Sequence, residues 1–293
     1  RKWMRGFTSP GALQPLHRTA QSAAGNRQVF CEHELRLTEP ETTQLKEFAK
    51  RHHLTLSSVM YGLWALVLSS IDGRNDLVFG IVVSGRHVPL PRVDEMVGVF
   101  INTLPVRATV RPDALLSEWL KELQEQRSEA TQFEHTPLSL VQSWSEVPRG
   151  TALFDSIVVF ENYPAVDWDT IARELRIESI RSFERSNYPL TLWILPGRQL
   201  SLKVGYDSGV LNRAKVTALL GNFGALLASI SDQTISELGQ QLLSTAAHPE
   251  MNQVQLVRPE CLDQEPPLAA IGAIAAKEQQ PAERSRNEGE KFE

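Results

Sequence analysis

Residues 77–107 place the strongest constraint on how this chain folds. They begin with a nearly continuous apolar run at 78–83, rich in β-branched residues, which is typical of a strand covered on both faces. The run stops at Ser84, Gly85 and Arg86, which offer a hydroxyl group, a permissive backbone and five guanidinium donors. The pattern predicts either a plain turn with a surface arginine or a loop whose backbone a ligand can approach closely.

A second strand is predicted after this loop. Two prolines restrict the loop backbone, and an apolar segment then runs from Gly98 to Arg107. This segment contains the polar pair Asn102 and Thr103. Buried amide and hydroxyl groups need hydrogen-bond partners, so we expect both side chains to find partners if the strand is buried.

The motifs in this region resemble those of the condensation domains of nonribosomal peptide synthetases. The pattern Phe-Gly-x-x-x-Ser-Gly-Arg occupies residues 79–86, and Gly-x-Phe-Ile-Asn-Thr-Leu-Pro-x-Arg occupies residues 98–107. Two later stretches, at 140–164 and 184–192, support the resemblance, which extends from about residue 1 to about residue 243.

The resemblance implies a CoA-dependent acyltransferase-like fold of two α/β lobes with a tunnel between them. In this family, a carrier-bound acyl or peptidyl thioester is attacked by the amine of an aminoacyl group on a second carrier. The resemblance implies substrates presented on phosphopantetheine arms, no tightly bound cofactor and no metal. It also implies six substrate-binding residues near the tunnel or the bridge between the lobes: Ser84, Gly85, Arg86, Asn102, Thr103 and Asn187.

The catalytic signature of the family, His-His, three residues and then Asp-Gly, is absent. His52 and His53 form a histidine pair, but Ser57 and Ser58 stand where the signature has Asp-Gly. The pair also falls at the end of a predicted helix, where cationic side chains favour the carbonyl dipole, so we interpret it as structural or exposed. No catalytic residue is therefore assigned, because in the family the signature belongs to the amino-terminal lobe.

Two other family motifs match only in part. His135 stands where the family carries a His-containing loop motif followed by Pro, and we predict that it caps a loop. Ser186 replaces the arginine that usually precedes the asparagine of the last motif, here Asn187. This replacement weakens the expected polar contact at that point.

The rest of the sequence predicts an α/β fold in which a mixed sheet is covered by helices, as one lobe of the family fold. Strands are expected at 29–37, 157–160, 174–182, 188–195 and 200–206, and helices at about 39–51, 59–71, 113–133 and 212–227. Residues 1–28 are predicted to be the end of a preceding helix and a linker, and residues 29–243 the carboxy-terminal lobe. Residues 244–293, rich in Pro, Glu, Gln, Lys and Ala, are predicted to be a mostly disordered tail.

Charge and cysteine content narrow the functional classes. The net charge of −5 argues against a nucleic-acid surface, and the most apolar predicted helix, at 59–71, is too short for a membrane span. Cys31 and Cys261 lie far apart without metal-type spacing, which predicts neither a disulfide framework nor a zinc site. A cytoplasmic protein without nucleic-acid or membrane partners is expected.

The leading hypothesis is a partial condensation domain that contributes half of the tunnel for amide-bond formation. Its expected partners are carrier domains, an amino-terminal condensation lobe and adjacent synthetase domains. Two alternatives stay open: a non-catalytic module that binds carrier proteins, and an inactive truncated relic. Condensation, epimerisation and cyclisation relatives share these motifs, so the resemblance covers all three.

Overall fold

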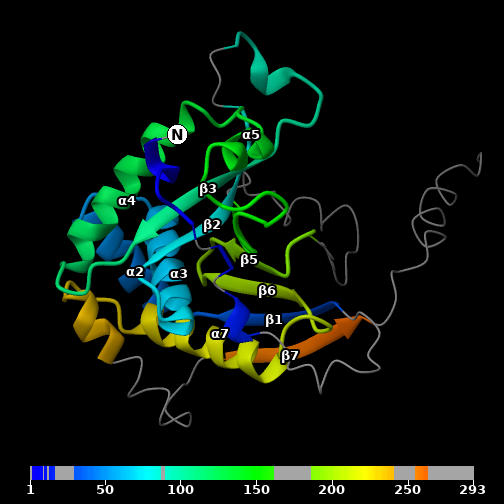
Figure 1. The fold of residues 1–293 in the computed structure, drawn as a ribbon. Helices are drawn as coiled ribbons and strands as arrows, with labels where there is room; N and C mark the ends of the chain where they lie inside the picture. Colours follow the sequence, from blue (N-terminus) through cyan, green and yellow to red (C-terminus); the bar gives the residue numbers. More distant parts are fainter. Residues whose placement is uncertain are drawn as a thin grey trace, which may run out of the picture. The chain divides into compact units, whose positions relative to one another are not determined.

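The computed structural model describes residues 2–8, 10–11, 13–16, 30–86, 90–161, 186–240 and 255–262 (Figure 1). The chain divides into a unit of residues 1–261 and a second of residues 262–293. Nearly all of the second unit lies outside the described residues. The fold below is therefore that of the first unit.

A mixed seven-stranded sheet, in the order β3-β2-β4-β5-β6-β1-β7, forms the centre of the unit (Figure 1). Its strands are β1 Phe30–Arg36, β2 Asp76–Val83, β3 Asn102–Thr109, β4 Ser156–Phe160, β5 Leu190–Leu195, β6 Ser201–Asp207 and β7 Gln255–Leu262. Strands β2, β4 and β5 are parallel, whereas β3, β6 and β1 pair antiparallel with their neighbours. The carboxyl ends of β2, β4 and β5 therefore point to one end of the sheet, and their amino ends to the other.

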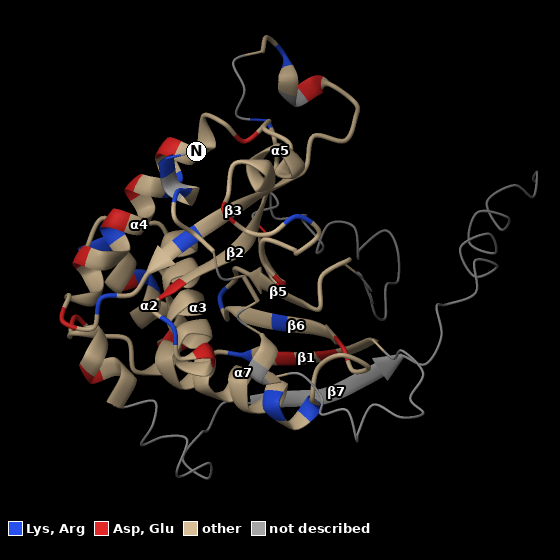
Figure 2. Cartoon of the chain, viewed as in Figure 1, with Lys and Arg blue, Asp and Glu red and all other residues tan. Residues whose placement is uncertain are grey.

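Four longer helices pack over one face of this sheet (Figure 1). They are α2 Glu39–Arg51, α3 Leu56–Asp72, α4 Leu116–Thr131 and α7 Arg213–Ala228. Helix α3 is buried on most of its circumference and contacts the other three, so it is the centre of the main core. Figure 2 shows that the charged side chains of α4 alternate in sign along the helix, while its apolar stripe, which includes Trp119 and Leu123, faces this core.

The capping box predicted at the start of α2 is confirmed. The backbone N–H of Thr38 donates to Glu41 Oε2 at 2.7 Å, and the backbone N–H of Glu41 donates to Thr38 Oγ1 at 3.4 Å. These two bonds pair helix-end donors that have no intrahelical acceptor. The local sequence alone therefore sets where α2 begins.

A second, smaller apolar cluster covers the other face of the sheet. It includes Met4, Phe7, Phe154 and Ile157, and short helix α5, Leu138–Ser143, packs beside it. Successive residues of β2 enter different clusters, with Val78 in the small one and Phe79 in the main one. This two-sided burial confirms the strand type predicted from the continuous apolar run.

Three parts of the chain differ from the sequence expectations. Residues Lys2–Met4 form a single 3-10 turn, η1, and not the end of an α-helix. Strand β7 lies inside the stretch for which a disordered tail is predicted, so that prediction is wrong for its eight residues. Cys31 is disulfide-bonded, which the wide spacing of the cysteines did not predict. The strand expected at 174–182 lies outside the described residues.

No single helix in the described ranges is long and apolar enough to cross a membrane. Helices α2 and α3 reach that length and composition only together, across a bend of 105°.

Candidate functional site

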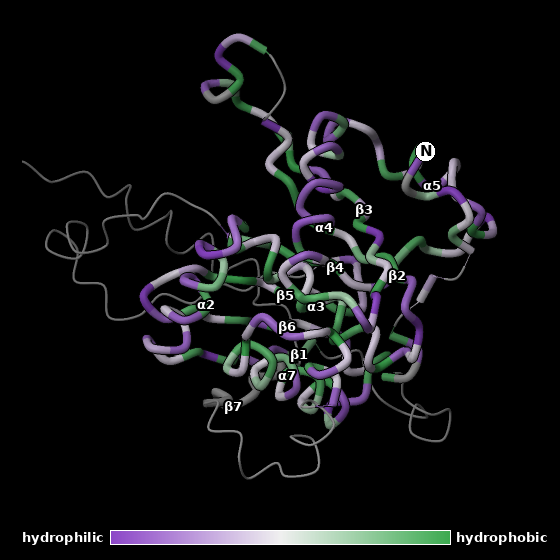
Figure 3. The backbone as a smooth tube through the Cα atoms, turned by 90° about the vertical axis from the view of Figure 1, so that its left-hand side faces the viewer, coloured by the Kyte–Doolittle hydropathy of each residue, from purple (hydrophilic) through white to green (hydrophobic). Residues whose placement is uncertain are grey.

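The carboxyl end of β2 carries a projecting segment, residues 90–101, which we call the arm (Figures 1 and 3). Arg86 holds its base. The Arg86 guanidinium carbon lies 4.4 Å from the centroid of the Phe100 ring, Nη2 donates to the Met96 carbonyl at 3.1 Å, and Nη1 donates to the Val93 carbonyl. A planar guanidinium suits this double task, because it stacks on a ring and still donates in its own plane.

Gly85 and Ser84 complete the turn beneath the arm. Gly85 has a φ of +69°, and a Cβ placed there would lie 1.9 Å from the Phe100 carbonyl oxygen, so only glycine fits. The backbone N–H of Arg86 donates to Ser84 Oγ at 3.3 Å. All three residues therefore shape the connection from β2 to the arm, which favours the turn reading of this motif. The Ser84 side chain remains exposed.

Asn102 joins the start of β3 to the loop between α4 and α5. Its Nδ2 donates to the carbonyl oxygens of Glu134 and Thr136, at 2.7 and 2.9 Å, and its Oδ1 accepts from the Thr103 N–H at 2.9 Å. The expectation that Asn102 finds partners is thereby confirmed. The two carbonyls flank His135, whose side chain is exposed, so the loop is held by Asn102 on both sides of the histidine.

Five of the six predicted substrate-binding residues come together at this end of the sheet. Val83, the last residue of β2, pairs with Asn102, so Ser84 begins where β3 begins. Ser84, Gly85 and Arg86 thus lie beside Asn102 and Thr103. Together these five residues form what we call the strand-end cluster, which is a candidate site and not a demonstrated one.

Asn187 lies elsewhere. It precedes β5, which runs parallel to β4 and so to β2, and it therefore sits at the amino ends of these strands. Its neighbour Ser186 accepts the Tyr188 N–H at 3.2 Å and so closes the turn, where the family usually has an arginine. The structure does not bring the exposed Asn187 together with the strand-end cluster.

One residue of this region has no mark in the sequence. Glu134 is only 1% exposed, in the loop that Asn102 holds. A buried carboxylate is rare and needs polar partners, so its position is of functional interest. A single Glu in a polar stretch between two helices gives no periodicity or motif from which its burial could have been predicted.

The histidine pair at the end of α2 is structural, as predicted. The His52 ring lies 4.6 Å from the Phe48 ring, and the His53 carbonyl accepts from Gln124 Nε2 at 3.1 Å. These contacts tie the end of α2 to α4. The pair therefore closes a helix junction.

A buried polar pair lies between β1 and β6. His33 Nε2 is 3.1 Å from the Tyr206 hydroxyl oxygen, and both residues are buried. Burial lowers the pKa of His33 below its ordinary value of 6.5, and the positive charge of Arg213 lowers it further. Burial also raises the pKa of Tyr206, so both rings are neutral near pH 7. Among the described residues, no group of three or more His, Cys, Asp or Glu side chains is arranged to hold a metal ion.

A mixed sheet with helices over one face, and motif residues at its strand ends, is the architecture of a chloramphenicol acetyltransferase-like lobe. Solved structures share this fold. A four-domain nonribosomal peptide synthetase matches with a TM-score of 0.59 at 17% identity, covering 80% of this chain and 18% of that one. The first condensation domain of the CDA synthetase matches with a TM-score of 0.55 at 17% identity, covering 80% of this chain and 50% of that domain.

Sequence comparisons identify the family. The family model of the condensation domain matches residues 7–251, so the chain belongs to the condensation-domain family. A linear gramicidin synthase of Brevibacillus parabrevis is 37% identical over 254 residues, which are 87% of this chain and 5% of the synthase. Surfactin synthase subunit 3 of Bacillus subtilis is 36% identical over 186 residues, 62% of this chain and 14% of that protein. The chain thus spans a small part of these relatives and about half of a solved condensation domain.

Proposed function

We propose that this chain forms the carboxy-terminal lobe of a condensation domain and contributes to amide-bond formation in a nonribosomal peptide synthetase. The observation that carries the proposal is the family match over residues 7–251, with both motifs of the strand-end cluster intact. The donor is an acyl or peptidyl thioester on one carrier domain. The acceptor is the amine of an aminoacyl group on another, and the carrier thiol leaves as the amide forms.

The strand-end cluster supplies one wall of the substrate tunnel in this proposal. Arg86 and Gly85 set the course of the arm, and Asn102 sets the position of the loop that carries His135. Ser84 and Thr103 offer hydroxyl groups toward a pantetheine arm or acyl chain. Asn187 would contact only a part of the substrate or carrier that reaches the opposite strand ends.

The proposal places the acid–base chemistry on a partner. The His-His-x-x-x-Asp-Gly signature would come from an amino-terminal lobe, whose second histidine positions or deprotonates the attacking amine. The substrates would arrive on phosphopantetheine arms of carrier domains in the cytoplasm. This chain would then bind and orient them without a cofactor of its own.

Reconstitution tests the proposal. The full chain is mixed with the segment that directly precedes the matched region in the linear gramicidin synthase, which serves as the amino-terminal lobe. Two carriers, one loaded with an aminoacyl donor and one with an aminoacyl acceptor, are added. Mass spectrometry of the acceptor carrier should then show a dipeptidyl thioester.

Two controls give the reaction its meaning. Omitting the chain, or changing the second signature histidine of the supplied lobe to Ala, should abolish the product. A well-folded complex that binds both carriers and yields no dipeptide would overturn the proposal in favour of the binding module. Absence of both binding and product would favour the inactive relic.

A further inference from the structure

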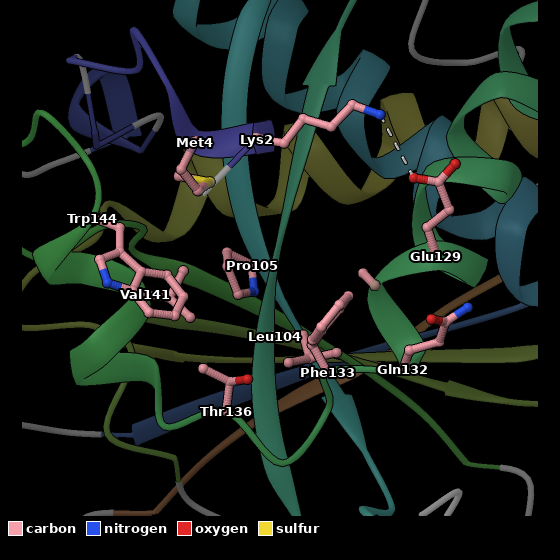
Figure 4. A pocket seen from close by; sticks show the side chains of 11 residues that line it. Lys2, Met4, Leu104, Pro105, Glu129, Gln132, Phe133, Thr136, Val141 and Trp144 are labelled. Atoms are coloured by element: carbon pink, nitrogen blue, oxygen red, sulfur yellow. Dashed lines mark ion pairs between the residues drawn. The ribbon is translucent and has the colours of Figure 1, made fainter.

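An apolar cavity of about 590 Å³ lies outside the strand-end cluster, between β3, the end of α4, and α5 (Figure 4). Its walls include Leu104 and Pro105 from β3, Phe133 from the loop after α4, and Val141 and Trp144 from the α5 region. Proline lacks the N–H that a neighbouring strand would need, so β3 is an edge strand that does not extend the sheet at Pro105. The cavity therefore sits against a sheet edge that side chains, and not another strand, must cover.

The rim of the cavity is apolar and exposed. Phe133 and Leu140 are 53% and 44% exposed, although both are large apolar side chains. The mouth carries one weak charge contact, Lys2 Nζ to Glu129 Oε2 at 3.9 Å, between two side chains that are mostly exposed. A contiguous apolar patch around a concave site is typical of an interaction surface.

The start of the chain forms one wall of the same cavity. Lys2 and Met4, among the first described residues, line it, and Figure 4 shows Met4 facing Trp144 and Val141 across the opening. Any polypeptide joined in front of residue 1 therefore leaves from the rim. Because the chain covers only half of a solved condensation domain, the other half has to pack against some part of this lobe.

We propose that this cavity is the docking seat of the amino-terminal condensation lobe, which inserts an apolar side chain between Phe133 and Trp144. The proposal rests on the proposed function, since it names the surface through which that partner binds. The covalent link at the rim would give the inserted group a high local concentration. Docking here would also brace the loop that Asn102 holds, because Phe133 and Thr136 belong to both the cavity and that loop.

The test fills the cavity and measures lobe binding. The amino-terminal lobe used for reconstitution is labelled with a fluorophore and titrated with the full chain, and anisotropy gives the dissociation constant. Ala130→Trp places an indole in the cavity, and we expect binding at least tenfold weaker. Lys121→Trp is the matched control, because it lies on the same helix, is exposed, and sits about 14 Å away along the axis.

A second variant covers a possible folding defect of Ala130→Trp. Phe133→Ser changes an exposed rim residue, so the core stays intact, and binding should weaken in the same direction. Thermal unfolding of each variant is compared with that of the unmodified chain. Equal binding by all variants, or no binding by the unmodified chain, would overturn the proposal.

Two further outcomes separate the possible occupants and the two proposals. A chain that dimerises alone and becomes monomeric with Ala130→Trp would show that a second copy fills the cavity, which overturns the proposal. Binding that weakens as expected, together with reconstitution that gives no dipeptide, would support the docking seat and reject the amide-forming function.

Discussion

At the residue scale, the strand-end cluster depends on groups that no other side chain can replace. Gly85 accepts both a left-handed backbone and a carbonyl oxygen where a Cβ would be. Asn102 donates to two carbonyls with one amide nitrogen, and Arg86 stacks and donates at once. These demands explain why short motifs at this point carry so much of the family signal.

Gly85→Ala should destabilise the fold around the arm. The φ of +69° and the contact with the Phe100 carbonyl oxygen both oppose a methyl group, and we expect a loss of more than about 1–2 kcal/mol. Urea unfolding measures it. Gly150→Ala is the control, because Gly150 has a φ of +85° with open space around it, so the difference isolates the clash. Equal losses in the two variants would contradict the close approach of the Phe100 carbonyl to Gly85.

Asn102→Asp should loosen the loop around His135. The substitution keeps the shape but removes both N–H donors, and leaving partly buried carbonyls unpaired costs about 1–3 kcal/mol each. Hydrogen exchange at residues 133–136 should speed up. Asn187→Asp, an exposed site at the opposite strand ends, should leave exchange in that loop unchanged.

His33 should make stability depend on pH. Its folded pKa lies below the ordinary value of 6.5, so the unfolded chain takes up a proton more readily. Stability is therefore full above about pH 6.5 and falls as the pH drops below it. Urea unfolding at pH 7.5 and 5.5 should show this loss, and His33→Gln should reduce it. Tyr206→Phe retains the titrating ring and should keep the pH dependence; the same slope in His33→Gln would contradict the assignment.

At the element scale, the arm is ordered by its base and not by burial. Among its described side chains, Val93 is the one fully buried apolar residue, whereas Val97 and Val99 are 103% and 95% exposed. The contacts of Arg86 with Val93, Met96 and Phe100 replace the core that the arm lacks. Such a segment belongs to the low-stability end of a fold.

Arg86→Lys should free the arm while leaving the body folded. Lysine has no planar fork and cannot bind both carbonyls while stacking on Phe100. We expect chymotrypsin to cleave within residues 90–101 several-fold faster, with a melting temperature close to that of the unmodified chain. Arg92→Lys, which alters only an exposed ion pair with Glu95, is the control. Equal cleavage rates in the two variants would show that Arg86 does not order the arm.

At the scale of the whole molecule, the lobe exposes apolar groups that a folded partner would cover. They lie on the arm and at the rim of the cavity: Leu90, Met96, Val97, Val99, Ile101, Phe133 and Leu140. Covering one large apolar side chain contributes about 1.5–3 kcal/mol, so several such groups are comparable with a net stability of about 5–15 kcal/mol.

The chain alone should therefore self-associate. Sedimentation velocity should show oligomers or aggregates that become a defined complex when the amino-terminal lobe is added. Val97→Ser combined with Val99→Ser should reduce the association of the chain alone, because it removes the two most exposed apolar groups of the arm. A monodisperse monomer with one cooperative unfolding transition would contradict this expectation.

Much of the fold is readable from local patterns, and the exceptions have physical causes. The apolar run of β2 and the Thr38–Glu41 capping box depend on neighbours in the sequence, and both are confirmed. Strand β7 has a strand-edge partner in the sheet but a composition like that of a disordered tail, so only its pairing reveals it. Glu134 and the apolar cavity likewise arise from contacts between distant segments.

The sequence by itself determined the family, the strand-loop-strand motif and the absence of the catalytic signature, because motif spacing and hydrophobic periodicity are local properties. The tertiary structure decided that five predicted site residues meet while Asn187 lies at the opposite strand ends. It also decided that Arg86 and Asn102 turn inward to hold the arm and the loop. The direction of β5 relative to β2 and the partners of a guanidinium or an amide are fixed only when the sheet closes, since strand order and side-chain contacts are long-range properties.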